Sequence, residues 1–333
     1  MIPRMPGTTY FAFLALLTCL PAVVTVAEVT PPVIKPGEDA LLRLEPPAPG
    51  IVVRYNLENR PPVMSDGVWL APVELPAGYT LTARAFHPDT DEESDAITVV
   101  GTPPGTQPRR ASTLVPVTQN RNWRLYDWPA RHAACADLMR TRQPEIVMLG
   151  DSITHFWGGD PVADRQSGPD SWDALFAGHR VVNLGFGWDR TENVLWRLTH
   201  GEFDETTPKV VVVLIGTNNI TLNSPAEISA GIKAICDEIH RRSPPTRILL
   251  LGIFPRGEDP GHEARAKVEQ VNALIAALDE RDYLTYLDIG NRFLERDGRI
   301  ARETMADFLH PTAKGYRIWA EAIRLPLQQL LRD

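Results

Sequence analysis

A serine, a histidine and an aspartate lie where they could form a catalytic triad. Ser152 follows the apolar run 146–150 and Asp151, within the segment LGDSITHFW. His310 lies in DFLHPTAKGY, three residues after Asp307. An Asp at this spacing can hold one ring nitrogen of the His and leave the other free to accept a proton. The pattern indicates a serine nucleophile with a histidine base, which is the chemistry of acyl transfer.

Each motif also has a purely structural interpretation. A serine directly after a strand is most often the N-cap of the following helix. His310 could equally be a surface residue beside the turn at Pro311, with Asp307 bonded only within that turn. Neither motif decides between the interpretations alone, but their joint occurrence favours the catalytic one.

Two further residues could stabilise the negative charge that develops on a reacting carbonyl oxygen. Asn218 could donate from its side-chain amide. Gly185 could donate from its backbone N–H, where no Cβ obstructs the approach. Taken singly, both are also ordinary turn residues.

The elements expected to position these residues form a parallel α/β sheet. Five apolar runs without polar alternation occur in the order IVMLG, VVNLG, VVVVLIG, ILLLG and YLDIG. Such runs are typical of strands buried on both faces, with helices in the connections. Helices are predicted over residues 225–242 and 262–280. Ser152, Gly185 and Asn218 lie at the ends of three runs, where ligands bind in such sheets.

The preceding residues indicate a second, smaller domain. Residues 28–101 contain short alternating segments separated by Pro, Gly and Asp clusters, which predict a small antiparallel β-sandwich. Residues 102–119 are rich in Pro, Gly, Ser and Thr and are interpreted as a linker. The α/β domain would then cover residues 120–333.

The N-terminus predicts a secreted or periplasmic protein. Residues 1–27 carry a single charge, Arg4, an apolar stretch FAFLALLTCL and small residues ending at Ala27, as in a cleaved signal peptide. The apolar core, about ten residues long, is shorter than the ~20 residues that a membrane-spanning helix needs. Lipid attachment at Cys19 is the alternative, and the Thr before this cysteine fits it poorly.

Charge and cysteine content exclude several classes of function. The formal net charge of −8 becomes −9 without the signal segment, because only Arg4 is removed. An acidic chain without a Lys/Arg cluster is a poor partner for nucleic acid or anionic lipid. Cys135 and Cys236 remain, too few for a disulfide framework and without metal-ligand spacing. We expect both to be buried small apolar residues, with one disulfide between them as the alternative, and we expect no metal site.

The segments GDSIT, NLGFGWDRTENVLWRL, IGTNN and DFLHPTAKGY resemble, in order and context, the SGNH or GDSL-like hydrolase superfamily. The similarity covers roughly residues 120–330 and includes HGEFDETTPKVVVVLIGTNNI and GIFPRGE. It resembles most the branch that contains the catalytic subunits of platelet-activating-factor acetylhydrolase. The resemblance implies a flavodoxin-like sheet. The small N-terminal module weakly resembles the β-domains attached to chitobiase and β-hexosaminidase enzymes.

The resemblance implies a serine esterase that requires no metal or organic cofactor. Ser152 would be the nucleophile, His310 the general base and Asp307 the residue that orients it. The oxyanion hole would consist of the Ser152 and Gly185 backbone N–H groups and the Asn218 side chain.

Three neighbouring residues are expected to contact the substrate: Asp151, Trp188 and Asn219. Close relatives read Gly-Gly-Asp where this chain has Gly-Trp-Asp. The Trp188 indole could narrow the acyl pocket or stack on a sugar, or it could be a packing residue. Asp151 could instead fix the turn by hydrogen bonds. Asp189 and Arg190 are expected to hold this loop by a salt bridge.

The preferred function is hydrolysis of short-chain, acetyl esters on carbohydrate outside the cell. The alternative with the same chemistry is a platelet-activating-factor-like phospholipid or aryl acetylhydrolase, and an acyltransferase would use the same triad. The alternative of another class is a non-catalytic glycan-binding surface protein. The partners would be a small-molecule or carbohydrate ester, with no nucleic acid and no membrane span; an oligomer remains open.

Overall fold

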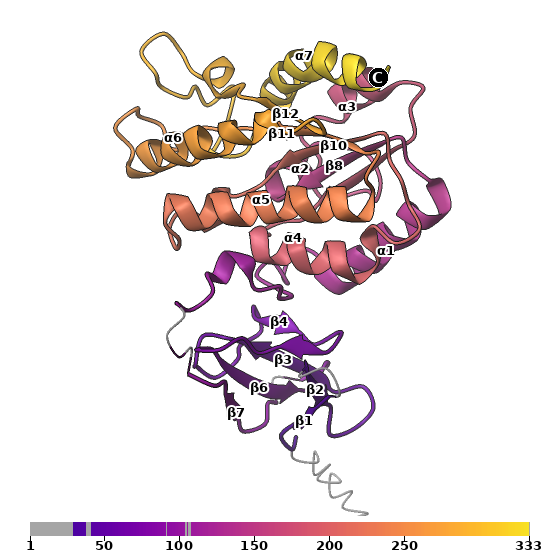
Figure 1. Ribbon diagram of the computed structural model, residues 1–333, viewed down its shortest axis with the longest axis vertical. Helices are drawn as coiled ribbons and strands as arrows, with labels where there is room; N and C mark the ends of the chain where they lie inside the picture. The colour runs from indigo at the N-terminus through magenta and orange to yellow at the C-terminus, as the bar shows by residue number, and fades with distance from the viewer. Residues whose placement is uncertain (1–28, 38–40, 91, 104, 106–107, 333) are drawn as a thin grey trace, which may run out of the picture.

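The computed structural model describes residues 29–37, 41–90, 92–103, 105 and 108–332. Their strands form a five-stranded parallel sheet and two small antiparallel sheets (Figure 1). Residues 1–27, interpreted above as a signal peptide, lie outside the described residues. No helix within the described ranges combines the length and apolar character needed to cross a membrane.

The parallel sheet confirms the predicted α/β architecture. Its spatial order is β12-β11-β10-β8-β9, so the chain starts near the middle and winds to both edges. Every residue of the inner strands β8 and β10 and of the edge strand β9 is buried, as expected of mainly apolar strands in a sheet covered on both faces. The strands are β8 (Ile146–Gly150), β9 (Val181–Gly185), β10 (Val210–Leu214), β11 (Arg247–Leu251) and β12 (Leu284–Leu287).

Helices cover both faces of this sheet and form two cores. The first face packs against α1 (Trp128–Arg142), α4 (Thr191–Arg197), α5 (Pro225–Arg242) and α6 (Glu263–Ala276). The second packs against α3 (Pro169–Phe176) and α7 (Ala313–Leu330), with the short α2 (Ser152–His155) at the sheet edge. Single turns complete the domain: η2 (Leu198–Glu202), η3 (Thr217–Asn219), η4 (Ala277–Glu280) and η5 (Gly290–Phe293).

Both predicted helices are present, and each begins after a capping residue. Ser224 caps α5, and its hydroxyl accepts from the Glu227 N–H while the Glu227 carboxylate accepts from the Ser224 N–H. His262 caps α6, which continues through η4 to Glu280. These local signals fixed the helix starts because they satisfy N–H groups that have no partner within the helix.

Cys135 on α1 and Cys236 on α5 are fully buried and free, as expected of small apolar residues. Burial raises the pKa of each thiol to about 12. Neither cysteine is a nucleophile at neutral pH.

The N-terminal sheets confirm the predicted antiparallel class. One sheet has the order β1-β2-β5 and the other β4-β3-β6-β7. They enclose a small core that includes Leu44, Val53 and Leu81. The strands are β1 (Val33–Pro36), β2 (Leu41–Glu45), β3 (Val52–Asn56), β4 (Gly67–Val68), β5 (Val73–Glu74), β6 (Thr80–Phe86) and β7 (Ile97–Val100).

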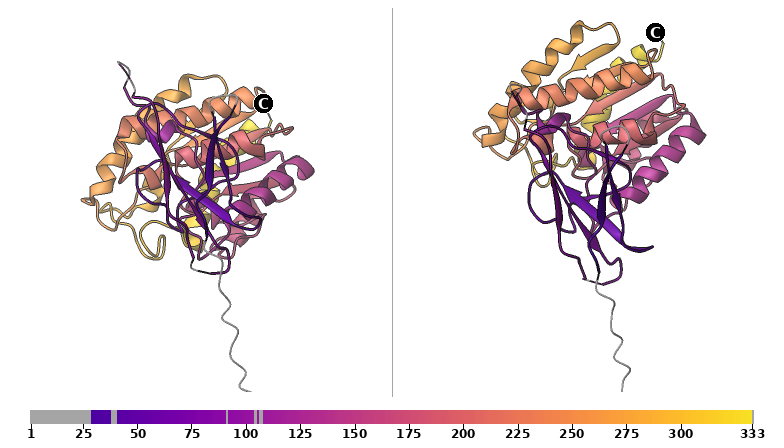
Figure 2. Two further views of the ribbon diagram at one scale, coloured as in Figure 1. Left: turned by 90° about the horizontal axis from the view of Figure 1, so that it is seen from below. Right: turned by 60° about the horizontal axis from the view of Figure 1, so that its bottom comes forward.

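The second half of the expected linker is a buried strap and differs from a solvated spacer. It contains the short helix η1 (Ser112–Leu114), whose Thr113 hydroxyl donates to the Glu227 carbonyl of α5 at 2.7 Å. The Thr118 N–H donates to the Tyr55 hydroxyl of β3 at 3.2 Å. The strap therefore joins the small sheets to the α4–α5 side of the α/β domain, below which they lie in Figure 1. In the left view of Figure 2, seen from below, the small sheets lie in front of that domain.

Candidate active site

Ser152 lies on the turn between β8 and α2, at the carboxyl edge of the sheet. Asp151, not Ser152, is the N-cap of α2: its Oδ1 accepts from the Ile153 N–H at 2.9 Å. The N-cap interpretation of Ser152 is therefore wrong, and its hydroxyl is free for another role. Gly150 permits the tight turn, because a Cβ there would collide with the carbonyl oxygen of Leu214 on β10.

The fold brings His310 to Ser152 across 158 residues of sequence. The Ser152 Oγ and the His310 Nε2 are 2.9 Å apart. The His310 Nδ1 lies 2.7 Å from the Asp307 Oδ2, and the His310 backbone N–H donates to the other carboxylate oxygen at 2.8 Å. Because Asp307 can only accept when ionised, Nδ1 carries the proton and Nε2 is left to accept from the serine.

The electrostatics of this pair suit an ionised orienting group. Partial burial alone would raise the pKa of Asp307, but hydrogen bonds from the His310 ring and backbone outweigh it and hold the pKa below its ordinary value. Asp307 is thus a carboxylate at neutral pH and can stabilise a positively charged imidazole.

A second histidine near the serine is not a base. Burial, with the charges of Arg131 and Arg197, holds the pKa of His155 far below its ordinary value. Its Nδ1 accepts from the Gly187 N–H at 3.2 Å. His155 is a neutral, fixed part of the cavity wall, so His310 is the histidine placed to accept the Ser152 proton.

Of the three residues expected to donate to an oxyanion, Ser152 and Asn218 line the cavity and Gly185 does not. The Asn218 Nδ2 donates to the Asp189 carbonyl at 2.9 Å, which fixes the amide and leaves its second N–H unused. The Gly185 N–H donates to the Asn183 Oδ1 at 2.8 Å. Gly185 lies within β9, outside the cavity lining, so its assignment as an oxyanion donor is corrected.

The loop after β9 offers a different donor, the backbone N–H of Trp188. The Gly187 N–H is taken by His155, and the Asp189 N–H donates to the Phe186 carbonyl at 3.1 Å. No partner of the Trp188 N–H is present among the described residues. Trp188 lies in the left-handed region with φ 65°, where glycine is the usual residue, and it lines the same cavity as Ser152.

Of the three expected substrate contacts, only Trp188 lies at the cavity. Its side chain is 51% exposed. Asp151 is buried beneath the turn and serves as the cap of α2. Asn219 is fully buried, and its amide bonds to the Thr191 N–H, Glu192 and Asn223. Both side chains are structural, so their assignment to substrate binding is corrected.

The cavity over Ser152 has a volume of about 560 Å³. Side chains of Tyr126, Phe156 and Leu309 form apolar walls, and Arg165 and Arg256 add positive charge at its edge. Sequence reasoning named neither arginine as a site residue, although Arg256 lies in the quoted segment GIFPRGE, because nothing local indicates that the two loops reach the cavity. The Gly- and Pro-rich insertion around residues 158–172, which contributes Arg165, was the available signal.

A family model described as the GDSL-like lipase/acylhydrolase family matches residues 148–318. The chain belongs to this family. It is 34% identical over 207 residues to the platelet-activating factor acetylhydrolase IB subunit alpha2 of Rattus norvegicus, covering 62% of this chain and 86% of that protein. It is 35% identical over 205 residues to the Homo sapiens alpha1 subunit, covering 61% and 84%.

The fold agrees with this assignment. A solved structure from Streptococcus pneumonia, whose description names a platelet activating factor, aligns with a TM-score of 0.51 and 22% identity, over 62% of this chain and 95% of that chain. The chain is therefore a carboxylic ester hydrolase of the SGNH superfamily, in the platelet-activating-factor acetylhydrolase-like branch. The alternative of a non-catalytic glycan-binding protein does not fit this family.

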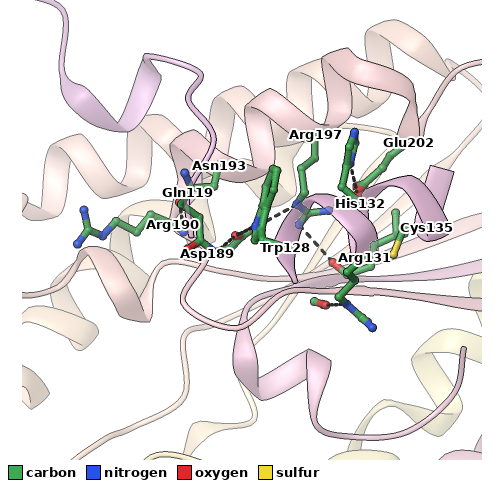
Figure 3. Close-up of polar contacts among 12 residues, drawn as sticks. Gln119, Trp128, Arg131, His132, Cys135, Asp189, Arg190, Asn193, Arg197 and Glu202 are labelled. Carbon is green, nitrogen blue, oxygen red and sulfur yellow. Dashed lines mark hydrogen bonds and ion pairs between the residues drawn. The ribbon is translucent and has the colours of Figure 1, made fainter. Parts of the chain in front are cut away.

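The GDSL-like domain holds its Trp188 loop with a buried ion network. Asp189 pairs with Arg197 at 2.8 Å and also accepts from Gln119 and Trp128, while Arg197 also pairs with Glu202 (Figure 3). All three charged side chains are fully buried.

The expected Asp189–Arg190 salt bridge is wrong. Arg190 extends away from Asp189 in Figure 3, and its nearest carboxylate is Glu192 at 3.8 Å.

Arg197, the true partner of Asp189, remains charged. Burial lowers the pKa of Arg197, but the charges of Glu202 and Asp189 outweigh this effect and raise the pKa. The network anchors the loop to α4 and explains how Trp188 is kept in a left-handed conformation.

The donor set at the site does not suggest a metal. Among the described ranges, no cluster of three or more His, Cys, Asp or Glu side chains could hold an ion. Nothing in the serine chemistry derived above requires one.

Proposed function

We propose that this chain is an extracellular serine esterase that removes acetyl and other short acyl groups from carbohydrate. The observation that carries the proposal is the hydrogen-bonded series from Ser152 through His310 to Asp307, with separations of 2.9 and 2.7 Å. Acyl transfer requires a nucleophile, a base and a group that orients the base, each within hydrogen-bond reach of the next.

In the proposed mechanism, Ser152 attacks the ester carbonyl while the His310 Nε2 takes its proton. The backbone N–H of Trp188, the N–H of Ser152 and the free amide N–H of Asn218 donate to the oxyanion. His310 then protonates the leaving alcohol. Water, activated by His310 in the same way, releases the carboxylic acid from Ser152 and restores the hydroxyl.

The preference for short acyl groups rests on the relatives and on the cavity. The two mammalian relatives are named as acetylhydrolases. Trp188 stands at the cavity where glycine would leave more room, so its indole restricts the space beside Ser152. An alcohol acceptor in place of water would give an acyltransferase by the same steps.

Carbohydrate is preferred to phospholipid as the alcohol part for three reasons. The chain is acidic and carries an appended β-domain, and the N-terminal residues suit secretion. The second candidate, an acetylhydrolase for ether phospholipid, is favoured by the positive charge of Arg165 and Arg256 beside apolar walls.

A series of p-nitrophenyl esters with increasing acyl length tests the catalytic proposal. We expect wild type to favour acetate and Ser152→Ala to lose nearly all activity. Ser229→Ala, on α5 and away from the cavity, is the matched control and should retain full activity. An active Ser152→Ala variant would refute the nucleophile. Acetate release from acetylated xylan, compared with an acetylated ether phospholipid, tests the substrate class.

A further inference from the structure

A second cavity lies between the β-domain and the hydrolase domain. Its volume of about 850 Å³ is within the range of ~300–1,000 Å³ that small-molecule ligands occupy. It shares no lining residue with the cavity over Ser152. The two cavities adjoin, because Arg121 and Leu222 line this one while their sequence neighbours Asn122 and Thr221 line the other.

Three guanidinium groups of this cleft lack a close carboxylate partner. Arg121 donates only to neutral oxygens, the Trp188 carbonyl and the Asn193 amide oxygen, both at 2.9 Å. Arg109 lies 3.6 Å from the centre of the Tyr79 ring. Within the described ranges, neither has a carboxylate within 4 Å.

Arg190, the third, is only loosely paired. Its Nε is buried and has no hydrogen-bond partner among the described residues. Its nearest carboxylate is Glu192, whose Oε1 lies 3.8 Å from the guanidinium, while the Oε2 accepts from the Asn219 amide and the Thr191 hydroxyl. Burial, and secondarily the charge of Arg190, lower the pKa of Arg121 to about 10, and the carboxylates of Glu192, Asp189 and Glu58 offset this only in part.

The other two carboxylates of the cleft form their ion pairs with a fourth arginine. Asp66 and Glu58 both pair with Arg60, on the β-domain side. In a chain with a net charge of −8, two arginines without a carboxylate partner and a third with a distant one form a site whose charge a bound anion would neutralise. Arginine presents a planar fork that matches a carboxylate in two hydrogen bonds.

The rest of the lining is suited to sugar hydroxyls. Amide and hydroxyl groups predominate on both walls: Asn56, Asn59, Ser65, Ser112, Gln119 and Asn223. The Gln119 amide also donates to the Gly187 carbonyl at 3.0 Å, and Arg121 to the Trp188 carbonyl, so the cleft contacts the loop that borders the catalytic cavity.

We propose that the cleft between the two domains binds an acidic oligosaccharide, whose uronate-type carboxylates pair with Arg109, Arg121 and Arg190. The β-domain would thus supply one wall of a distal subsite, and a polymer held there would present neighbouring sugars to Ser152. This inference rests on the proposed function in one respect, that the substrate is carbohydrate.

The test is calorimetric titration of the full chain with unesterified trigalacturonic acid, with maltotriose as the neutral ligand. We expect trigalacturonic acid to bind, more weakly as salt is raised, and maltotriose to bind at least tenfold more weakly. Arg109→Gln and Arg190→Gln should each weaken trigalacturonic acid binding about tenfold or more. Arg140→Gln, an exposed arginine of α1 outside the cleft, is the control with equal charge change and should bind as wild type.

Absence of trigalacturonic acid binding, equal binding of maltotriose, or unchanged binding in both cleft variants would overturn the inference. Arg109 is exposed, so its variant is expected to fold. Hydrolysis of p-nitrophenyl acetate by the same preparation separates the two proposals. Hydrolysis without binding refutes the cleft alone, and binding without hydrolysis refutes the esterase alone.

Discussion

At the scale of single residues, Asn218 is expected to act on the transition state and not on substrate binding. Its amide is fixed by the Asp189 carbonyl, with one N–H left over beside Ser152. Loss of one oxyanion donor typically lowers turnover ~10²–10³-fold. We expect Asn218→Ala to show that loss in kcat with p-nitrophenyl acetate and little change in KM. A loss confined to KM would contradict the role.

Trp188 is expected to contribute through its backbone rather than its indole. Trp188→Gly keeps the N–H and suits the positive φ. We therefore expect kcat for p-nitrophenyl acetate to stay within about threefold of wild type, and longer acyl esters to become relatively better substrates because the cavity widens. A hundredfold loss on acetate would show that the indole itself takes part in the reaction.

At the scale of elements, the turn from β8 to α2 contains a buried carboxyl group, Asp151, that makes the folded state less stable as pH rises. Burial raises the pKa of Asp151 to about 7, against an ordinary value of ~3.9. The folded state therefore holds this proton more tightly than the unfolded chain, and this group lowers the free energy of unfolding as pH rises from about 4 to 7. Asp151→Asn keeps the cap on the Ile153 N–H without that ionisation.

The expected result is that Asp151→Asn becomes more stable relative to wild type as pH rises across this window. Urea unfolding of both proteins at pH 4.5 and pH 7.5 measures the difference. If the two pH values give the same difference in unfolding free energy, the buried carboxyl is not the cause.

The elements could be predicted from sequence where local chemistry decides them. Mainly apolar runs indicated β8 to β11, and the Ser224–Glu227 capping box located α5. The fifth predicted run, YLDIG, overlaps β12 only at Tyr286 and Leu287. The proximity of Ser152, His310 and Asp307 was predictable because Ser152 and His310 each lie in a recognisable motif. The proposed oxyanion donor, the Trp188 N–H, was not predictable, because side chains from elsewhere in the chain, such as His155, determine which N–H near β9 stays free.

The same reasoning explains the error over the buried ion pair. The side chains of the adjacent residues Asp189 and Arg190 point in different directions. Arg197, the last residue of α4, is the one that reaches the Asp189 carboxylate. Composition likewise indicated a flexible linker before residue 120, but its polar Thr113 and Thr118 side chains are used as hydrogen-bond donors to the two domains.

At the scale of the whole molecule, the strap should make the two domains unfold together. Thr118 is 4% exposed, and its N–H donates to the Tyr55 hydroxyl of β3, while the Val117 carbonyl next to it accepts from the Asn193 amide of α4. Tyr55→Phe leaves the buried Thr118 N–H unpaired, a loss of ~1–3 kcal/mol. We expect a lower free energy of unfolding and still one transition, coincident by tryptophan fluorescence and circular dichroism. Two separated transitions in the wild-type protein would show that the strap joins the domains without coupling their stability.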